Sequence, residues 1–270
     1  MQIRNHFFKK EFGQNFLRNK KVVSKLVSIL NISPLDLVVE IGPGDGFITE
    51  EILNQTTNYL GIEVDSDLIP VLKDKFTKAK FINEDFLKVN LQGYLNENEY
   101  DQEMNIKFIG NLPFNNSKDI ISTVFHLTKK LNIELATFVV QEEVSQSYVS
   151  KIPNMTPIGA IANIYAEPKK FETIARKYFE PSPKVAGGII SFPIKENIPD
   201  SAIEIEKLIK VGFSSPRKTL INNIKNSNRY NNVDDAFKSI GLSLNSRAAE
   251  ISSDTWIMLN NNLILSSYSL

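Results

Sequence analysis

A side-chain amide and an aromatic ring stand three residues apart in the segment Asn111-Leu112-Pro113-Phe114, directly after the strand-like run 106–110. Proline fixes its own φ and biases Leu112 toward an extended backbone, so the amide and the ring can face one point. The amide offers hydrogen-bond donors and an acceptor, and the ring offers a face for stacking. The segment therefore suits a flat ring that carries an amine, although a match this short, taken alone, more often marks a strand that ends in a turn.

A glycine loop, Gly42-Pro43-Gly44-Asp45-Gly46, lies between an apolar run and an amphipathic one. Its glycines permit a tight turn and a close approach of a ligand to the backbone. Their spacing differs from the Gly-x-Gly-x-x-Gly of dinucleotide-binding folds. Because Glu40 and Asp45 place negative charge at the loop, we expect it to reject phosphate and to favour a cationic ligand.

Glu63 and Asp85 each follow a further strand-like run, at 59–62 and 80–83. A carboxylate at the position of Glu63 can accept both hydroxyls of a ribose, and Asp85 can accept from an exocyclic amine. A glycine loop, a ribose acid and an amine acceptor together describe a site for S-adenosylmethionine, with no metal. Two alternatives stay open here: a nicotinamide dinucleotide, and carboxylates that only solvate strand ends.

These residues require a sheet to bring them together, and the chain predicts one. Between residues 35 and 141, short β-branched or apolar runs alternate with longer amphipathic ones, which is typical of a parallel sheet with helices on its faces. Parallel strands end at one edge, where such sheets bind ligands. The predicted strands are 37–41, 59–62, 80–83, 106–109 and 135–140, with a helix over 20–30 and a final strand pair at 173–176 and 188–192 around the Pro-rich loop 179–183.

After Pro199 the pattern changes to short helices without strands. We predict a domain boundary near Ile198, which separates a first domain, 1–198, from a helical domain, 199–270. Phe213 and Trp256 lie on apolar helical stripes and are expected in the core of the second domain. The predicted helices are 201–213, 216–226, 232–240 and 254–265, with a polar loop at 226–232.

The composition narrows the chemistry and the compartment. The chain has no cysteine and two histidines, which excludes disulfides, thiolate metal sites and a cysteine nucleophile and disfavours a histidine metal centre. No apolar run of about 18 residues and no signal peptide is evident, so a cytoplasmic protein without a membrane contact is expected. Net charge is zero, but residues 1–25 hold seven Lys or Arg against one acid, and residues 205–230 hold six against one. Such clusters permit basic faces that bind phosphates, although they also fit solvated helices.

Several sequence blocks, spread along the chain, include these candidate residues or lie beside them. Their order resembles that of the KsgA-type small-subunit ribosomal RNA adenine dimethyltransferases, and the resemblance covers nearly the whole chain. It implies a Rossmann-like class I methyltransferase sheet with helices on both faces, plus a small C-terminal all-α domain that contacts rRNA. The blocks are Phe12-Gly13-Gln14-Asn15-Phe16-Leu17, Glu40–Gly44, Gly110–Phe114, Phe179–Val185, Arg217–Leu220 and Arg247–Glu250.

The resemblance also implies an activity and its residues. The reaction is the dimethylation of the exocyclic nitrogen on each of two adjacent adenosines near the 3′ end of small-subunit rRNA, by a monomer acting on an assembling 30S-type particle. The implied methyl-donor site comprises Asn15, Leu17, Gly42, Gly44, Glu63, Asp85 and Asn111. The implied target-adenine site comprises Asn111, Leu112, Pro113, Phe114 and Phe179. Candidate phosphate contacts are Arg4, Lys9, Lys10, Lys20, Lys21, Arg217, Lys218, Lys225 and Arg229.

This chain departs from the family pattern in two places. Relatives commonly carry Tyr where this chain has Phe114, so stacking is kept and a hydroxyl is absent. The segment 154–160 lacks the usual Tyr-Gly-Arg run apart from Gly159, which puts an RNA contact near Ala160 in doubt. Two alternative functions stay open: a related enzyme that dimethylates large-subunit rRNA and confers antibiotic resistance, and a non-catalytic ribosome assembly factor.

Overall fold

The computed structural model describes residues 13–98, 100–101 and 103–266 of the chain, which form two compact units. Of the described residues, the first unit takes 13–145 and 169–194, and the second takes 146–168 and 195–266. The predicted boundary placed 146–168 in the first domain. In the structure this segment packs with the C-terminal helices; for example, the Met155 N–H donates to the Ala249 carbonyl at 3.1 Å.

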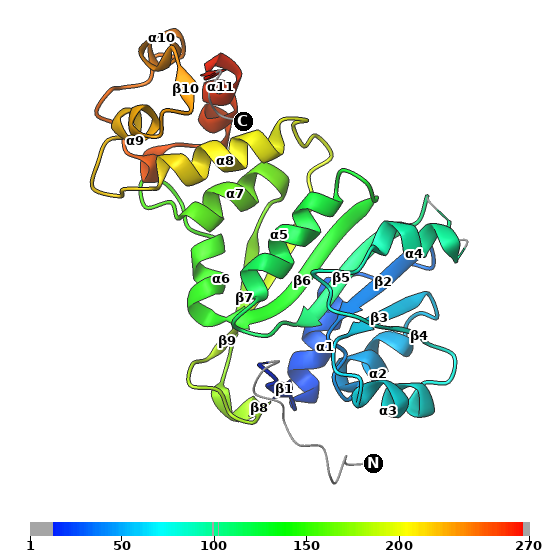
Figure 1. Cartoon of the computed structure of the whole chain (residues 1–270). Helices are drawn as coiled ribbons and strands as arrows, with labels where there is room; N and C mark the ends of the chain where they lie inside the picture. Colours follow the sequence, from blue (N-terminus) through cyan, green and yellow to red (C-terminus); the bar gives the residue numbers. More distant parts are fainter. Residues whose placement is uncertain (1–12, 99, 102, 267–270) are drawn as a thin grey trace. The chain divides into compact units, whose positions relative to one another are not determined.

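The first unit is built on a single large sheet in the order β4-β3-β2-β5-β6-β9-β7 (Figure 1). Strands β4 to β6 are parallel, and β9 is antiparallel to both of its neighbours. The predicted Rossmann-like sheet is confirmed, although the final strand pair begins earlier than predicted and β7 ends before Arg176. The strands are β2 Asp36–Ile41, β3 Tyr59–Glu63, β4 Lys80–Asn83, β5 Asn105–Asn111, β6 Ile133–Gln141, β7 Lys169–Ile174 and β9 Gly187–Pro193.

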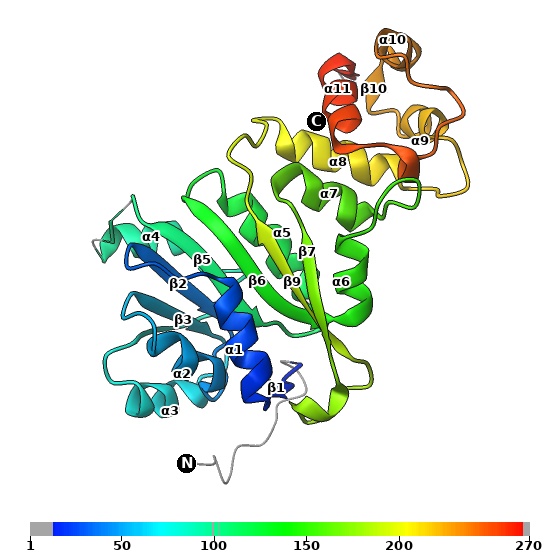
Figure 2. The same cartoon turned by 180° about the vertical axis from the view of Figure 1, so that it is seen from behind.

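Helices cover both faces of this sheet. Helix α5 lies in front of it in Figure 1, and α1 lies in front of it in the opposite view of Figure 2. The helices of this unit are α1 Lys20–Ile29, α2 Phe47–Leu53, α3 Leu68–Lys75, α4 Leu91–Glu97 and α5 Ser117–Leu127, and α6, Glu142–Tyr148, spans the boundary between the units.

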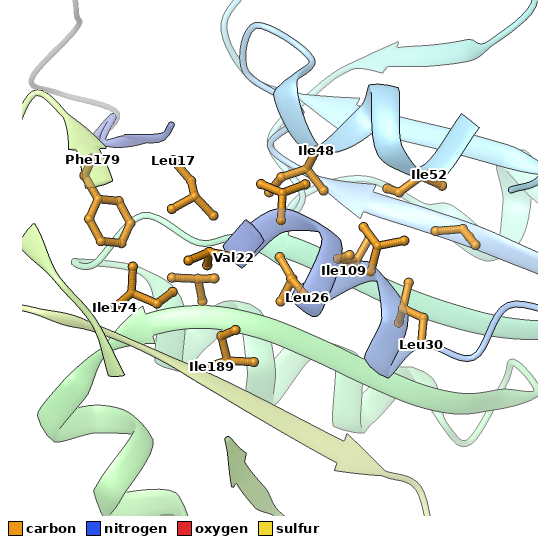
Figure 3. Close-up of a cluster of buried hydrophobic side chains, with 14 of the residues drawn as sticks. Leu17, Val22, Leu26, Leu30, Ile48, Ile52, Ile109, Ile174, Phe179 and Ile189 are labelled. Atoms are coloured by element: carbon orange, nitrogen blue, oxygen red, sulfur yellow. The ribbon is translucent and has the colours of Figure 1, made fainter. Parts of the chain in front are cut away.

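Helix α1 shows how the sequence produces the core. The Asn19 side chain accepts a hydrogen bond from the Val22 N–H at 3.1 Å and caps the first turn. Apolar residues at helical spacing, including Val22 and Leu26, then form one buried face. They pack against Ile109 of β5 and Ile189 of β9 in a cluster drawn in Figure 3. Burial of each such side chain contributes about 1.5–3 kcal/mol to folding.

The strand order reverses between β2 and β5: from β2 the sheet continues to β3 and β4 on one side, and from β5 it continues to β6 on the other side. Ligands of open α/β sheets bind at the carboxyl edge beside such a reversal. Glu63 is the last residue of β3 and Asn111 is the last residue of β5, whereas Gly42 directly follows β2. The topology therefore gathers the predicted site residues at one edge.

In the first unit, two short strands were not predicted from the sequence. β1, Phe16–Leu17, pairs antiparallel with β8, Phe179–Glu180. This pairing joins the N-terminal segment to the Pro-rich loop, so Leu17 lies opposite Phe179. The segment that contains the predicted donor residue Asn15 is thereby held beside the segment that contains a predicted target-base residue.

The second unit is mainly helical. The Trp256 side chain is fully buried, and the Phe213 ring stacks on it at 6.3 Å between centroids and 29° between planes. Its helices are α7 Pro157–Tyr165, α8 Ala202–Gly212, α9 Leu220–Asn226, α10 Val233–Ser239 and α11 Ser253–Asn262. The prediction of no strands is wrong in one detail, because β10, Tyr230–Asn231, pairs with β11, Ile264–Leu265.

Candidate functional site

A cavity of about 200 Å³ lies in the first unit, at the carboxyl edge of the sheet. Its walls come from the segment 13–16, the ends of β2, β3 and β5, the loop 84–87 after β4, and Ile120 of α5. The predicted donor residues Asn15, Gly42, Gly44, Glu63, Asp85 and Asn111 all line this cavity, as do Leu112 and Pro113. Most of the predicted site is thus in one place.

Three predicted residues lie outside the cavity lining. The Leu17 side chain is 2% exposed and Phe179 is 4% exposed, and both belong to the hydrophobic core. The half-buried Phe114 ring meets the edge of Phe179 at 6.2 Å between centroids and 71° between planes. Of these two aromatic rings, Phe114 has the exposure to receive a planar ligand, whereas Phe179 is buried and contacts it.

The glycine loop has the backbone that its residues predict. Gly42, with φ of +69°, has open space where a side chain would be, so a ligand can approach the backbone there. Gly44, with φ of +63°, lies against Phe16, and an added Cβ would stand 2.5 Å from that ring. The two glycines therefore serve different needs, access at Gly42 and close packing at Gly44.

Glu63 is anchored by the backbone on both of its oxygens. Oε2 accepts from the Gly44 N–H at 2.9 Å, and Oε1 accepts from the Asp65 N–H at 2.9 Å. Because each carboxylate oxygen has two lone pairs, each can accept one further hydrogen bond. Burial of the side chain, which is 4% exposed, raises the pKa of Glu63 above its ordinary value. The carboxylate is therefore fixed in direction and able to accept hydroxyl groups of a ligand.

The acids Glu40 and Asp45 do not act as predicted. Glu40 does not line the cavity, and its Oε2 accepts from the hydroxyls of Tyr59 at 2.6 Å and Thr49 at 2.7 Å. Burial raises the pKa of Glu40 to about 7. Asp45 is paired with Arg18. The prediction that these two carboxylates present their charge to a ligand is wrong, and Glu63 and Asp85 are the carboxylates predicted for the site that line the cavity.

The loop after β4 supplies a mixed polar and apolar wall. Asp85 is oriented by the Leu87 N–H, which donates to its Oδ1 at 3.0 Å. Leu87 and Val64, both in the lining, are 37% and 41% exposed, which is unusual for large apolar side chains. Exposed apolar groups beside a carboxylate suit a flat, partly polar ring such as a nucleobase. Both residues were missed because a single Val or Leu gives no functional signal in sequence.

Asn111 has one half of its amide occupied and the other half unused. Its Nδ2 donates to the Asn15 carbonyl at 2.6 Å. Its Oδ1 is buried and has no hydrogen-bond partner in the described part of the chain. A buried amide oxygen without a partner costs roughly 1–3 kcal/mol, so such an atom in a cavity marks a position for a hydrogen-bond donor of a ligand.

The segment 13–16 closes one side of the cavity. Gln14 donates from Nε2 to Asp65 at 2.8 Å, which ties the segment to the loop after β3. Gln14 and Phe16 belong to a resembling sequence block, so that block was a signal for them. Of the predicted phosphate contacts, Lys20 and Lys21 are exposed, whereas Arg4, Lys9 and Lys10 lie outside the described residues.

Two other features are absent from the described part of the chain. No group of three or more His, Cys, Asp or Glu residues that could hold a metal ion is found within residues 13–98, 100–101 and 103–266. In that same part of the chain no helix has the length and apolar character needed to cross a bilayer.

The chain is similar to known proteins over almost all of its length. The sequence model of the family described as Ribosomal RNA adenine dimethylase matches residues 5–264. The Ribosomal RNA small subunit methyltransferase A of Sulfurihydrogenibium sp. is 34% identical over 260 residues, which is 93% of this chain and 94% of that protein. The protein of the same name from Mycoplasma mobile is 32% identical over 262 residues, 94% of this chain and 98% of that protein.

A solved structure supports the fold. The crystal structure of a dimethyladenosine transferase from Plasmodium falciparum matches with a TM-score of 0.73 and 18% identity, covering 90% of this chain and 95% of that one. The chain therefore belongs to the ribosomal RNA adenine dimethylase family, and it is an enzyme that transfers methyl groups from S-adenosylmethionine to adenine in ribosomal RNA.

Proposed function

We propose that this enzyme dimethylates the exocyclic nitrogen of two adjacent adenosines near the 3′ end of small-subunit rRNA, within an assembling 30S-type particle. The choice of small-subunit RNA is supported by the relatives at 32% and 34% identity, which are small-subunit methyltransferases by name. The single observation that carries the chemistry is the buried, unpartnered Oδ1 of Asn111, whose amide is held in place by the Asn15 carbonyl.

The cavity fits S-adenosylmethionine by the chemistry of its walls. Glu63 holds free lone pairs for the two ribose hydroxyls, and the open space at Gly42 admits the amino-acid part of the donor close to the backbone. Val64 and Leu87 cover the faces of the adenine ring, and Asp85 accepts from its amine. When bound, the donor supplies an electrophilic methyl group on a positively charged sulfur.

The acceptor side is formed by the end of β5 and the turn after it. The Leu112 N–H donates to the Val139 carbonyl at 3.0 Å, and the Asn116 N–H donates to the Pro113 carbonyl at 3.1 Å, so the turn is fixed by its own backbone. The Asn111 Oδ1 and the Leu112 carbonyl accept from the target amine as its nitrogen becomes tetrahedral and positive. Catalysis is then mainly positioning, and no strong general base is needed.

Phe114 holds the target base outside the RNA stack. Extruding a base costs a few kcal/mol, and stacking on an aromatic side chain returns about 1–3 kcal/mol. The ring is half-buried and makes an edge-to-face contact with Phe179, which holds the ring in place. Because stacking needs no hydroxyl, Phe at this position serves the same role as the Tyr that is common in relatives.

The helical unit supplies the contact with the RNA backbone. The Leu220 N–H donates to the Ser246 carbonyl at 2.8 Å, which brings the end of the block Arg217–Leu220 beside the start of the block Arg247–Glu250. Arg217, Lys218 and Arg247 in these blocks are exposed, and phosphate contacts of this kind position RNA without reading its sequence. Ala160, by contrast, is 2% exposed and offers RNA no surface.

The test compares two kinds of unmethylated particle as substrate. The purified enzyme and labelled S-adenosylmethionine are incubated with small-subunit and large-subunit particles from cells that lack the corresponding modifications. We expect label in small-subunit RNA as N6,N6-dimethyladenosine. Label in large-subunit RNA instead would favour the antibiotic-resistance activity, and no label in either would indicate a non-catalytic assembly factor.

A further inference from the structure

Arg18 connects three parts of the first unit whose relative positions must be fixed for the reaction. It directly follows β1, and its N–H donates to the Tyr178 carbonyl at 2.7 Å. Its Nη1 is paired with the Asp45 carboxylate in the glycine loop, and its Nε donates to Glu180 Oε2 at 3.0 Å. One side chain thus links β1, the donor loop and β8.

The surroundings of Arg18 favour a fixed geometry. The side chain is 31% exposed, and its Asp45 partner is 15% exposed, so this pair is better shielded from solvent than an ordinary surface pair. The guanidinium lies 5.2 Å from the Phe16 ring centroid and 6.0 Å from that of Phe47. A planar cation near two aromatic rings and with two carboxylate partners is a role that Lys fills poorly.

The consequence of this link reaches Asn111 through β1. The pairing of β1 with β8 fixes the position of the backbone just before β1. This backbone includes the Asn15 carbonyl, which accepts a hydrogen bond from the Asn111 Nδ2. An amide has one NH2 group and one oxygen, so fixing Nδ2 also fixes the direction of Oδ1. Any displacement of β1 relative to β5 therefore rotates or shifts the acceptor atom.

We infer that Arg18 is a positioning residue for methyl transfer: by tying β1 to Asp45 and Glu180, it holds the Asn15 carbonyl in place and so aims Asn111 Oδ1 at the target amine. The inference rests on the proposed function of Asn111. Arg18 does not line the cavity, so it does not touch the donor itself and acts through the residues that it holds.

The second methyl transfer depends more strongly on this alignment than the first. In each transfer a nitrogen–carbon bond forms, the sulfur–carbon bond breaks with its electron pair returning to sulfur, and one proton leaves the nitrogen for solvent. After the first transfer the amine has one N–H left, so one of its two acceptor contacts is lost. A loosened Asn111 is then expected to leave monomethylated adenosine as a released product.

The experiment compares Arg18→Met and Arg18→Lys with Lys75→Met. Lys75 forms a surface ion pair with Glu50 at 3.4 Å, neither residue lines the cavity, and Lys75 serves as the matched control for loss of a paired cation. We expect Arg18→Met to lower kcat by about 10- to 100-fold, as for a small misplacement of reacting groups, with donor Kd within about twofold of wild type. Monomethyladenosine should rise to a major product, and Arg18→Lys should fall between wild type and Arg18→Met.

A second readout needs no turnover. In the full-length wild-type protein the Asn111 side-chain amide should give an exchange-protected NMR signal, and Arg18→Met should lose that protection while Lys75→Met keeps it. The inference is overturned if the Asn111 amide stays protected in both Arg18 variants, or if their activity loss is entirely a weaker donor Kd with an unchanged product ratio. Absence of rRNA methylation by wild type refutes the proposed function instead, and the amide signal still decides the role of Arg18.

Discussion

Removal of the Phe114 ring is the most informative single change on the acceptor side. Stacking of a base on an aromatic side chain contributes about 1–3 kcal/mol, which corresponds to a loss of roughly 5- to 150-fold in kcat/KM for RNA in Phe114→Ala. Phe114→Tyr keeps the ring and should stay within about threefold of wild type. Because Phe114 does not line the donor cavity, the donor Kd should be unchanged in both variants.

The loss of stacking must be separated from a loss of stability. Phe114 also makes an edge-to-face contact with Phe179, worth about 0.5–1.5 kcal/mol, and thermal unfolding measures that part directly. Phe171→Ala is the matched control, because this ring is 41% exposed on β7 and has no place in the site. The assay is kcat/KM at subsaturating small-subunit particles. Equal losses in Phe114→Ala and Phe114→Tyr, or no difference between Phe114→Ala and Phe171→Ala, would refute the stacking role.

Three other changes test the donor site and the core. Glu63→Ala removes acceptors for two ribose hydroxyls at about 1.5–3 kcal/mol each, so calorimetry should show donor affinity at least about 100-fold weaker; an unchanged affinity would remove Glu63 from the site. The pKa of Glu40 is about 7, against an ordinary 4.5. The proton on Glu40 therefore stabilises the folded state fully below about pH 4.5, and this contribution of ~3 kcal/mol to the free energy of unfolding is lost as the pH rises through about 7. Glu40→Gln should therefore raise Tm at pH 8 and change it little at pH 5, and an effect larger at pH 5 contradicts the assignment. Lys107→Met leaves the carboxylate of Asp36, 2.8 Å from Nζ and 1% exposed, without its partner; chemical unfolding should show a loss of about 3–5 kcal/mol with activity per folded molecule retained.

Much of the site was predictable because parallel strands end at a common edge. Gly42, Glu63, Asp85 and Asn111 are far apart in sequence, and each follows or ends a strand of the sheet, so topology alone placed them together. The direction of a side chain within a strand was not predictable in the same way. Every residue of β2 is buried, so no alternation shows that Glu40 points toward Thr49 and away from the cavity.

The structural features that were not predicted are those that leave no periodic pattern in the sequence. β1 and β8 have two residues each, too few to show alternation, and their pairing depends on contacts between residues 162 and 164 positions apart. The assignment of 146–168 to the helical unit likewise depends on distant contacts. Gly159 instead serves close packing within the segment itself, since an added Cβ would stand 2.5 Å from Ser150 Oγ. The link from Arg18 to Asp45 and Glu180 has no counterpart in any sequence pattern.

The most direct test of the central claim is to map modified adenosines in small-subunit rRNA from cells that lack this protein. The proposed function predicts that two adjacent N6,N6-dimethyladenosines near the 3′ end are absent in those cells, return with the wild-type protein, and do not return with Asn111→Ala. Persistence of both modified nucleotides without the protein, or their full recovery with Asn111→Ala, would contradict it.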